Sequence, residues 1–321
     1  MKVAAIVITY NDGYKFKEWV DHHELYKDEL YMHIIVDNGS NPEYLTMVER
    51  NFTNSTIIKR TTNGGCTAAY NDGIRIALSD PVVDAIMLIG NDMKLERGGI
   101  TRLSQFLDSN STYGMVAPII LDKDSDSIED FGCEISRFLM MKPYDAGKKY
   151  SEISVPERIV TSVTGGMNLS SRKFYEKVGF QDDNLFMYSD EVDMAIRSKE
   201  AGFKMAVTAE VKSWHQHINP DGTQIRNNSS TFLGSRNKVY LAKKYFGIIR
   251  VIMQFFYFVL LFIGLSFREK LAFSKIRYFS WSVIGAFYGL INCMEIPKFI
   301  DIENPRSLKN KKDKNYNCHN I

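Results

Sequence analysis

The first hundred residues alternate short apolar runs with helix-length segments, and this alternation restricts the possible folds more than any other feature. The apolar runs are Val3–Thr9, His33–Val36, Thr56–Lys59 and Ala85–Ile89. A helix-length segment, Thr67–Ser79, follows the Gly64-Gly65 turn and precedes Asp80-Pro81. Such strand–helix–strand alternation predicts an α/β domain, with a mostly parallel, Rossmann-like sheet flanked by helices on both faces.

Polar side chains follow three of the predicted strands, at the point where each strand ends. These turns read Thr9-Tyr10-Asn11-Asp12, Asp37-Asn38-Gly39-Ser40 and Gly90-Asn91-Asp92. In open α/β sheets, ligands bind beyond the carboxyl ends of the strands. The sequence therefore predicts a ligand site formed by these three turns.

The rest of the N-terminal region fits one large domain, which we expect over residues 1–240. The chain has 321 residues, enough for one large domain or two modest ones. Leu121–Val160 is irregular and rich in charge, which predicts loops and small strands. Ser170 or Ser171 can cap a helix that runs to Val178 and stops at Gly179.

Charge and cysteine usage give no indication of a nucleic-acid-binding, disulfide-stabilised or secreted protein. The net charge is only +2, so the composition gives no argument for a nucleic-acid partner. The four cysteines are far apart and show no metal-finger spacing, which fits a reducing compartment. The chain enters a strand-like run at once, without the pattern of a secretory signal. We therefore expect the N-terminal domain to be cytosolic.

The C-terminal part combines apolar segments with positive charge. Ile248–Phe267 is long enough to consider as a membrane span, whereas Ser280–Met294 is too short. From Arg268 to the end there are ten Lys or Arg against five Asp or Glu. A single membrane span or a helical hairpin would place some of these cations on the outer side of the membrane, which conflicts with the positive-inside tendency. We expect residues 241–306 to form helices in the inner-leaflet interface, and residues 307–321 to form a disordered basic tail. The alternatives are a buried core helix or a homodimer interface.

A carboxylate cluster, Asp190, Glu191 and Asp193, begins another helix pattern, and a strand-like segment then leads to His215 and His217. A carboxylate at this position can act as a general base, and a histidine that the fold places beside it can complete a metal site. Alternatively, the acids only complement the helix dipole. Asp193 pairs naturally with Arg197, four residues on.

Together these motifs resemble the inverting family-2 glycosyltransferases with the GT-A fold. The resemblance rests on TYND, VDNGS, NGGCTAAYNDGI, the acidic turn and the late DEVD and histidine, and it covers about Val3 to Asn237. The most similar pattern is the rhamnosyltransferase-like branch that builds bacterial surface polysaccharides such as capsule, O-antigen or cell-wall polymers. The QxxRW signature of processive synthases is absent.

The resemblance implies a donor site for a UDP- or dTDP-sugar. A carboxylate at Asp37 can accept the imide N–H of uracil or thymine, although the same residues suit a tight turn. The remaining residues with an implied donor-side role are Thr9, Tyr10, Asn11, Asn63, Gly64, Asn71, Asn91 and Arg236.

A divalent ion, Mg²⁺ or Mn²⁺, is implied at Asp92 and His215. Asp92 matches the last acid of the family's metal-binding turn, but Gly90 replaces the first acidic or amide position. Such an ion would bridge the two donor phosphates and stabilise the departing nucleoside diphosphate.

Glu191 matches the position of the family's base, although the order of the two acids is swapped and Asp190 stays an alternative. Thr164, Gly165 and Gly166 resemble the family's turn near the acceptor. The sequence thus predicts sugar transfer to a lipid-linked glycan, by a peripheral or monotopic protein at the cytoplasmic face of the membrane. The rival interpretations are a catalytically inactive glycan-binding or scaffold module and a nucleotidyltransferase-like enzyme, which would usually carry a glycine-rich phosphate loop.

Overall fold

The computed structural model describes residues 1–123, 125–215, 228–268 and 273–297. It divides into two compact units. The first unit comprises Met1–Ser136, Met140–Phe186 and the chain from Asp190 to the end of the last strand. The second comprises Arg137–Leu139, Met187–Ser189 and the C-terminal helices.

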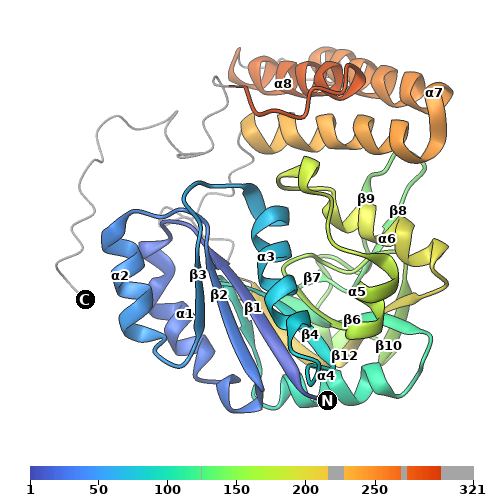
Figure 1. Cartoon of the computed structure of the whole chain (residues 1–321). Coiled ribbons are helices and arrows are strands. Elements are labelled where there is room, and N and C mark those ends of the chain that lie inside the picture. Colours follow the sequence, from blue (N-terminus) through green and yellow to red (C-terminus); the bar gives the residue numbers. More distant parts are fainter. Residues whose placement is uncertain (124, 216–227, 269–272, 298–321) are drawn as a thin grey trace. The chain divides into compact units, whose positions relative to one another are not determined.

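The first unit is built on one ten-stranded sheet (Figure 1), whose main path runs β10-β12-β6-β11-β4-β1-β2-β3. Its strands are β1 (Val3–Thr9), β2 (Met32–Asp37), β3 (Thr56–Lys59), β4 (Ala85–Gly90), β5 (Met93–Leu95), β6 (Tyr113–Asp122), β7 (Ile128–Asp130), β10 (Glu157–Val160), β11 (Met167–Ser171) and β12 (Lys204–His215). The pairs β1–β2, β1–β4, β2–β3 and β6–β12 are parallel. A small hairpin, β8 (Cys133–Ile135) and β9 (Met141–Pro143), lies apart from the sheet.

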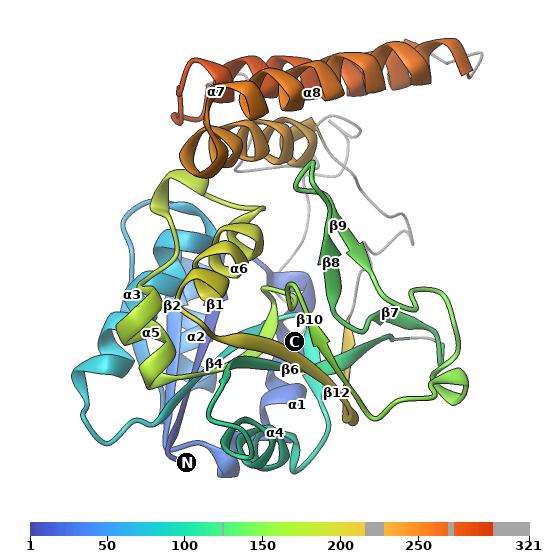
Figure 2. The ribbon, with the colours of Figure 1, turned by 90° about the vertical axis from the view of Figure 1, so that its right-hand side faces the viewer.

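Helices cover both faces of this sheet (Figures 1 and 2). They are α1 (Phe16–His23), α2 (Pro42–Asn51), α3 (Gly65–Ser79), α4 (Gly99–Asp108), α5 (Arg172–Val178) and α6 (Asp190–Glu200). Side chains of β1 alternate between two cores: Ala4 and Ile6 pack with α3, α5 and α6, whereas Ala5 and Val7 pack with α1, α2 and α4. The predicted two-sided α/β layer is therefore confirmed.

The predicted boundaries agree closely with the observed elements. The first and third strands begin and end where expected. The second is one residue longer at each end, and the fourth is one residue longer at its carboxyl end. Ser171 caps α5 by accepting a hydrogen bond from the Phe174 N–H, and Gly179 ends the helix with φ of 85°. α3 begins at Gly65 rather than Thr67, directly after the turn, and Gly65 has φ of 82°, a conformation that glycine adopts readily.

The second unit is helical. α7 (Asn228–Arg268) is broken at Gly247, where φ is 78°, and α8 (Phe273–Leu290) packs on it. Gly285 and Gly289 permit this packing, because a Cβ at either position would collide with a carbonyl oxygen of α7. Residues 228–240 belong to this unit, so the helical part of the chain begins before the expected boundary at residue 240.

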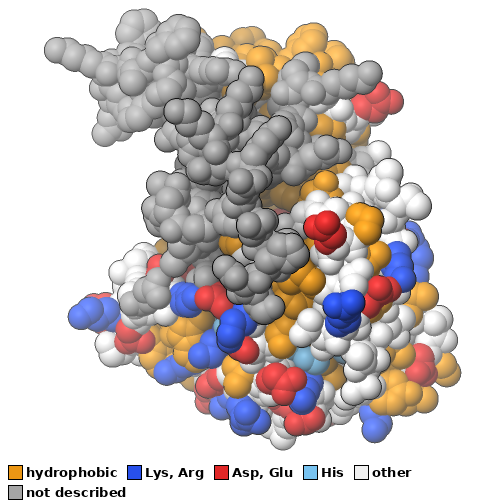
Figure 3. Space-filling view, turned by 90° about the vertical axis from the view of Figure 1, so that its left-hand side faces the viewer, with side chains coloured by type: hydrophobic (Ala, Val, Ile, Leu, Met, Phe, Trp, Pro, Cys, Tyr) orange, Lys and Arg blue, Asp and Glu red, His pale blue; other side chains and the backbone are white. Residues whose placement is uncertain are grey.

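An apolar stripe runs along the second part of α7. Its exposed members lie at positions that a helix places on one side: Ile249, Ile252, Met253, Phe256, Leu260 and Ile263. Hydrophobic side chains also gather over the helical unit in Figure 3. One described helix, Ser229–Leu261, is long and apolar enough to cross a membrane, and only 17% of its most apolar window is buried. The stripe is compatible with membrane association. Residues 307–321 and the cation-bearing side chains at 268, 270, 275 and 277 lie outside the described part.

Candidate active site

Three strand ends meet at one edge of the sheet. Thr9 of β1 is in register with Asp37 of β2, and Ile8 is in register with Gly90 of β4. The turns that follow are joined by side chains, since Asn91 Nδ2 donates to Asp12 Oδ2 at 2.9 Å and to Thr9 Oγ1 at 3.4 Å. The sheet therefore brings together the three polar turns that the sequence singled out.

Asp37 offers an unused acceptor at this edge. The residue is 1% exposed, and its Oδ2 accepts the Ser40 N–H at 3.2 Å. Its Oδ1 is buried and has no hydrogen-bond partner in the described part of the protein. A buried carboxylate oxygen without a donor is costly, so this atom is suited to a ligand N–H such as the imide of a pyrimidine.

The other residues expected on the donor side shape the turns. Thr9 hydrogen-bonds to the Tyr44 hydroxyl, and Tyr10 follows it at the end of β1. Asn11 has φ of 51°, and its Oδ1 accepts both the Asn41 N–H and the Asn41 amide at 3.0 Å and 2.9 Å. These bonds hold the first two turns in a defined relative position.

A second group of residues expected on the donor side forms hydrogen bonds with the VDNGS turn. The Asn38 side chain donates to Asn63 Oδ1 at 2.9 Å and accepts the Gly64 N–H at 3.1 Å. Asn71 is different, because its buried side-chain amide makes two hydrogen bonds to the segment before α6. Its Nδ2 donates to the Gln181 carbonyl at 2.8 Å, and its Oδ1 accepts the Gln181 N–H at 3.0 Å. Asn71 thus has a structural role, and its expected contact with the nucleoside stays a prediction.

Asp92 and His215 lie face to face. Asp92 Oδ2 is 3.6 Å from His215 Nε2, and the other imidazole nitrogen, Nδ1, is 2.8 Å from Glu129 Oε1. Burial disfavours the protonated ring, but the interactions with Asp92 and Glu129 outweigh it and raise the pKa of His215 to about 9. Burial would also raise the pKa of Asp92, yet His215 and Lys15 hold this pKa below its ordinary value. Glu129, on β7, had no signal in the sequence.

These two side chains fit a divalent ion with few protein ligands. Oxygen and imidazole ligands lie about 2.0–2.2 Å from such an ion, so two ligands of one ion are about 3 Å apart, close to the observed spacing of Asp92 and His215. Within the described residues, no group of three or more His, Cys, Asp or Glu side chains could hold a metal. Phosphate oxygens and water would have to complete the coordination. His217 lies outside the described residues.

Gly90 lies close to Asp92 and to the Gly165-Gly166 turn. A Cβ at Gly90 would lie 2.9 Å from Asp92 Oδ1 and 3.0 Å from Met93 Cγ, and the Gly90 N–H donates to the Gly166 carbonyl at 2.7 Å. A side chain at this position would require the Asp92 carboxylate and the Met93 side chain to shift, which flexible side chains can do. Asp92 is the one carboxylate that the Gly90-Asn91-Asp92 turn carries.

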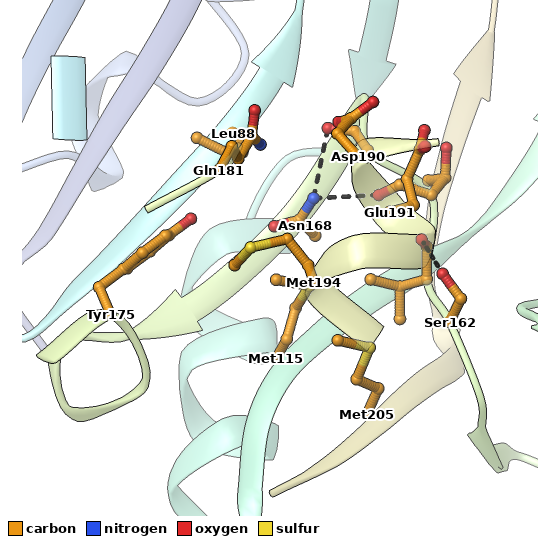
Figure 4. Close-up of a pocket in the computed structure, with 13 residues that line it drawn as sticks. Leu88, Met115, Ser162, Asn168, Tyr175, Gln181, Asp190, Glu191, Met194 and Met205 are labelled. Carbon is orange, nitrogen blue, oxygen red and sulfur yellow. Dashed lines mark hydrogen bonds between the residues drawn. The ribbon is translucent and has the colours of Figure 1, made fainter. Parts of the chain in front are cut away.

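Glu191 lies beside the glycine turn that contacts Gly90. A Cβ on Gly165 would be 2.7 Å from Glu191 Oε1, so only a glycine lets this carboxylate approach the backbone. Asn168 Nδ2 fixes the turn by donating to the carbonyls of Thr164 at 3.0 Å and Gly165 at 3.3 Å (Figure 4). The turn expected near the acceptor thus connects the Asp92 turn with the carboxylate expected to be the base.

The two neighbouring acids at the start of α6 differ from Glu191 in their surroundings. Asp190 lines a small pocket together with Glu191 (Figure 4), and burial and the charge of Glu191 raise its pKa well above its ordinary value. The raised pKa makes Asp190 the less suitable of the two acids as a base, and the role of Glu191 stays a prediction. Asp193 is fully buried and accepts the Arg197 Nε–H at 2.9 Å, which confirms its structural pairing.

The backbone before α6 is strained. Phe186, Tyr188 and Ser189 have φ of 62°, 68° and 65°, in the left-handed region that non-glycine residues rarely adopt. Such strain persists only where surrounding bonds hold it, and it is common at functional sites. Asn237 supplies two of these bonds, donating to the carbonyls of Met187 at 2.9 Å and Tyr188 at 2.7 Å.

Arg236 lies in the helical unit. It is fully buried, and its guanidinium donates to the Met294 carbonyl at 2.8 Å and to Asn237 Oδ1 at 3.0 Å. Burial lowers the pKa of Arg236 to about 10. These bonds give the residue a structural role, and its expected contact with the donor diphosphate stays a prediction.

Comparison with known proteins identifies a family and several relatives. The family model "Glycosyl transferase family 2" matches residues 4–179. The low-salt glycan biosynthesis hexosyltransferase Agl10 of Haloferax volcanii is 20% identical over 81% of this chain and 82% of its own length. An N-acetylglucosaminyl-diphospho-decaprenol L-rhamnosyltransferase of Mycobacterium tuberculosis is 22% identical over 68% of this chain and 76% of its own length.

The fold is also shared with a solved structure. The mannosyltransferase PcManGT from Pyrobaculum calidifontis, in complex with GDP-Man and Mn²⁺, superposes with a TM-score of 0.55 and 14% identity, over 91% of this chain and 88% of that one. The expected GT-A fold is thereby confirmed. With its family model spanning more than half the chain, the protein belongs to glycosyl transferase family 2 and is a glycosyltransferase of glycan or polysaccharide biosynthesis.

Proposed function

We propose that the protein transfers a sugar with inversion from a UDP- or dTDP-sugar to a lipid-linked glycan, at the cytoplasmic face of a membrane. The observation that carries this proposal is the arrangement of Asp92, His215 and Glu191 around the Gly165-Gly166 turn. A donor diphosphate beside Asp92 would leave the sugar near the Glu191 carboxylate.

The donor base is proposed from Asp37. Its buried Oδ1 is an acceptor without a described partner, and uracil and thymine both present an imide N–H that could donate to it. Asn11 and Asn63, with Thr9, Tyr10 and Gly64, would complete the walls of this nucleoside site.

The chemistry requires one proton transfer and one displacement. Glu191 removes the proton from an acceptor hydroxyl as the oxygen bonds to the anomeric carbon. The bond between that carbon and the diphosphate breaks on the opposite side, which inverts the configuration and leaves both bonding electrons on the nucleoside diphosphate. A Mg²⁺ or Mn²⁺ ion held by Asp92 and His215 would stabilise this charge when bound.

The acceptor is proposed from two independent features. The mycobacterial relative is named for a diphospho-decaprenol-linked sugar. The apolar stripe on α7 would suit a protein that meets its acceptor at a membrane surface.

A screen of sugar nucleotides tests the function. The full-length protein is incubated with UDP-, dTDP- and GDP-sugars and with Mn²⁺ or Mg²⁺, and the release of nucleoside diphosphate is followed over time. Slow hydrolysis of a UDP- or dTDP-sugar that depends on Glu191 supports the proposal. Binding of the nucleotides without turnover under any condition would favour an inactive module.

A further inference from the structure

Lys15 is a cation placed at the candidate diphosphate site, and neither the motifs nor the family resemblance drew attention to it. It ends the short 3-10 helix η1 (Gly13–Lys15), which directly follows the polar turn after β1. Its Nζ lies 2.7 Å from Asp92 Oδ2, the oxygen that also faces His215. The side chain of Lys15 is 14% exposed and that of Asp92 is 24% exposed.

The position of this ammonium is well defined. The Lys15 N–H donates to the Asp12 carbonyl at 3.0 Å, and the Lys15 Nζ lies 5.4 Å from the centre of the Tyr14 ring. Asp12 is itself held by Asn91, the neighbour of Asp92. The Asp92 carboxylate, 2.7 Å away, supplies the negative charge that offsets the partial burial of this ammonium. Lys15 thus carries a positive charge at the strand ends.

The composition of the Gly90-Asn91-Asp92 turn gives this charge a function. The turn carries a single carboxylate, so an ion at Asp92 and His215 would have few protein ligands. A departing diphosphate nevertheless needs positive charge close to its oxygens. The lysine side chain is flexible, so its ammonium can move from the Asp92 carboxylate to a phosphate oxygen without a change in the backbone.

We infer that the Lys15 ammonium is a resident counter-ion for the donor diphosphate, which pairs with Asp92 in the free protein and with a phosphate oxygen when the nucleotide binds. This inference rests on the proposed nucleotide-sugar site. It implies that the protein binds a nucleoside diphosphate even without a divalent ion. The contact strengthens binding of the diphosphate and leaves the nucleoside contacts unchanged.

Nucleotide titrations of full-length variants test the inference. Lys15→Met removes the charge and keeps the length of the side chain, whereas Lys15→Arg retains the charge. Lys17→Met is the matched control, because Lys17 lies on α1 with its side chain 72% exposed and paired with Asp21. Calorimetry measures the Kd of UDP, dTDP and GDP and of uridine, thymidine and guanosine, once with EDTA and once with Mn²⁺.

The expected result is selective. In EDTA, Lys15→Met weakens binding of the preferred nucleoside diphosphate by about ten-fold or more, which is the size expected for a hydrogen bond to a charged group. Affinity for the corresponding nucleoside stays within about two-fold, and Mn²⁺ reduces the loss. Lys15→Arg retains most of the affinity, and Lys17→Met binds as the wild type does.

Two results would overturn the inference and leave the proposed function intact. One is an unchanged affinity of Lys15→Met for the diphosphate. The other is an equal loss of affinity for the nucleoside and the diphosphate, which would indicate a structural role. Failure of the wild-type protein to bind any of the three diphosphates, with or without Mn²⁺, would instead overturn the proposed function and this inference with it.

Discussion

Glu129 holds the imidazole of His215, with Oε1 2.8 Å from Nδ1, so that the second ring nitrogen faces Asp92. Carboxylate partners of this kind orient metal-binding histidines and raise their basicity. Because Glu129 lies on β7 and His215 at the end of β12, the pair joins two strands that flank β6. The orientation of the histidine is thus set by the sheet.

Glu129→Gln is expected to weaken Mn²⁺ binding by about ten-fold, because partners of metal-binding histidines typically contribute this much or more. The amide still fills the space but no longer supplies a negative charge to the ring. Electron paramagnetic resonance of free Mn²⁺, in the presence of a bound nucleoside diphosphate, measures the affinity. Glu134→Gln, at an exposed position on β8, is the control. Equal Mn²⁺ affinity in both variants and the wild type would contradict the assignment.

Glu191→Gln is expected to lower sugar transfer and donor hydrolysis by about 10²–10⁴-fold, the usual contribution of a general base. The substitution keeps the shape of the side chain above Gly165, so the Kd for the nucleoside diphosphate should stay nearly unchanged. Initial rates and calorimetric titration of the same preparation separate the two effects. Asp190→Asn provides the comparison, since it removes the neighbouring acid. A larger loss of rate in Asp190→Asn than in Glu191→Gln would exchange their roles.

Asp130→Asn is expected to stabilise the fold at neutral pH. Burial raises the pKa of Asp130 from 3.8 to about 6, so the folded state binds a proton more tightly than the unfolded state does. As pH rises from about 4 to 6, the wild type therefore loses stability relative to the variant, which has no proton to lose. We expect a gain of about 1–2 kcal/mol in the free energy of unfolding at pH 7, smaller than the full shift would give, and little gain at pH 4.

Urea unfolding followed by tryptophan fluorescence at several pH values measures this effect. In the Asp130→Asn variant the side-chain amide oxygen can still accept the Gly132 N–H, so the local turn is retained. Asp126→Asn, at an exposed position, controls for the loss of one negative charge. A stabilisation that is equal at pH 4 and pH 7 would argue against a protonation effect.

Phe256→Glu combined with Leu260→Glu is expected to lower binding to anionic lipid vesicles by roughly 100-fold or more, because each apolar side chain contributes about 1.5–3 kcal/mol on burial. Both side chains are exposed, at 55% and 65%, on the stripe of α7. Sedimentation of the full-length protein with vesicles measures the partition coefficient. Ile159→Glu on β10, 58% exposed, is the matched control. If the double variant binds vesicles normally but changes from dimer to monomer, the stripe is a subunit interface.

The sequence by itself determined the α/β layer and most of the ends of its strands. Apolar periodicity and turn residues are local signals, and they placed β1, β3 and the cap of α5 correctly. The candidate acids and histidine came from the resemblance of their motifs to a family, and their roles stay predictions.

Only the tertiary structure decided which side chains act together. Lys15 and Asp92 are 77 residues apart, and Glu129 and His215 are 86 apart, so no local pattern could pair them. The hydrogen bonds of Asn71 to Gln181 and of Arg236 to Met294 could not be predicted either, because long-range packing decides these partners. The physical reason is that these contacts join segments far apart in the sequence, and such contacts exist only once the sheet and the helices have packed.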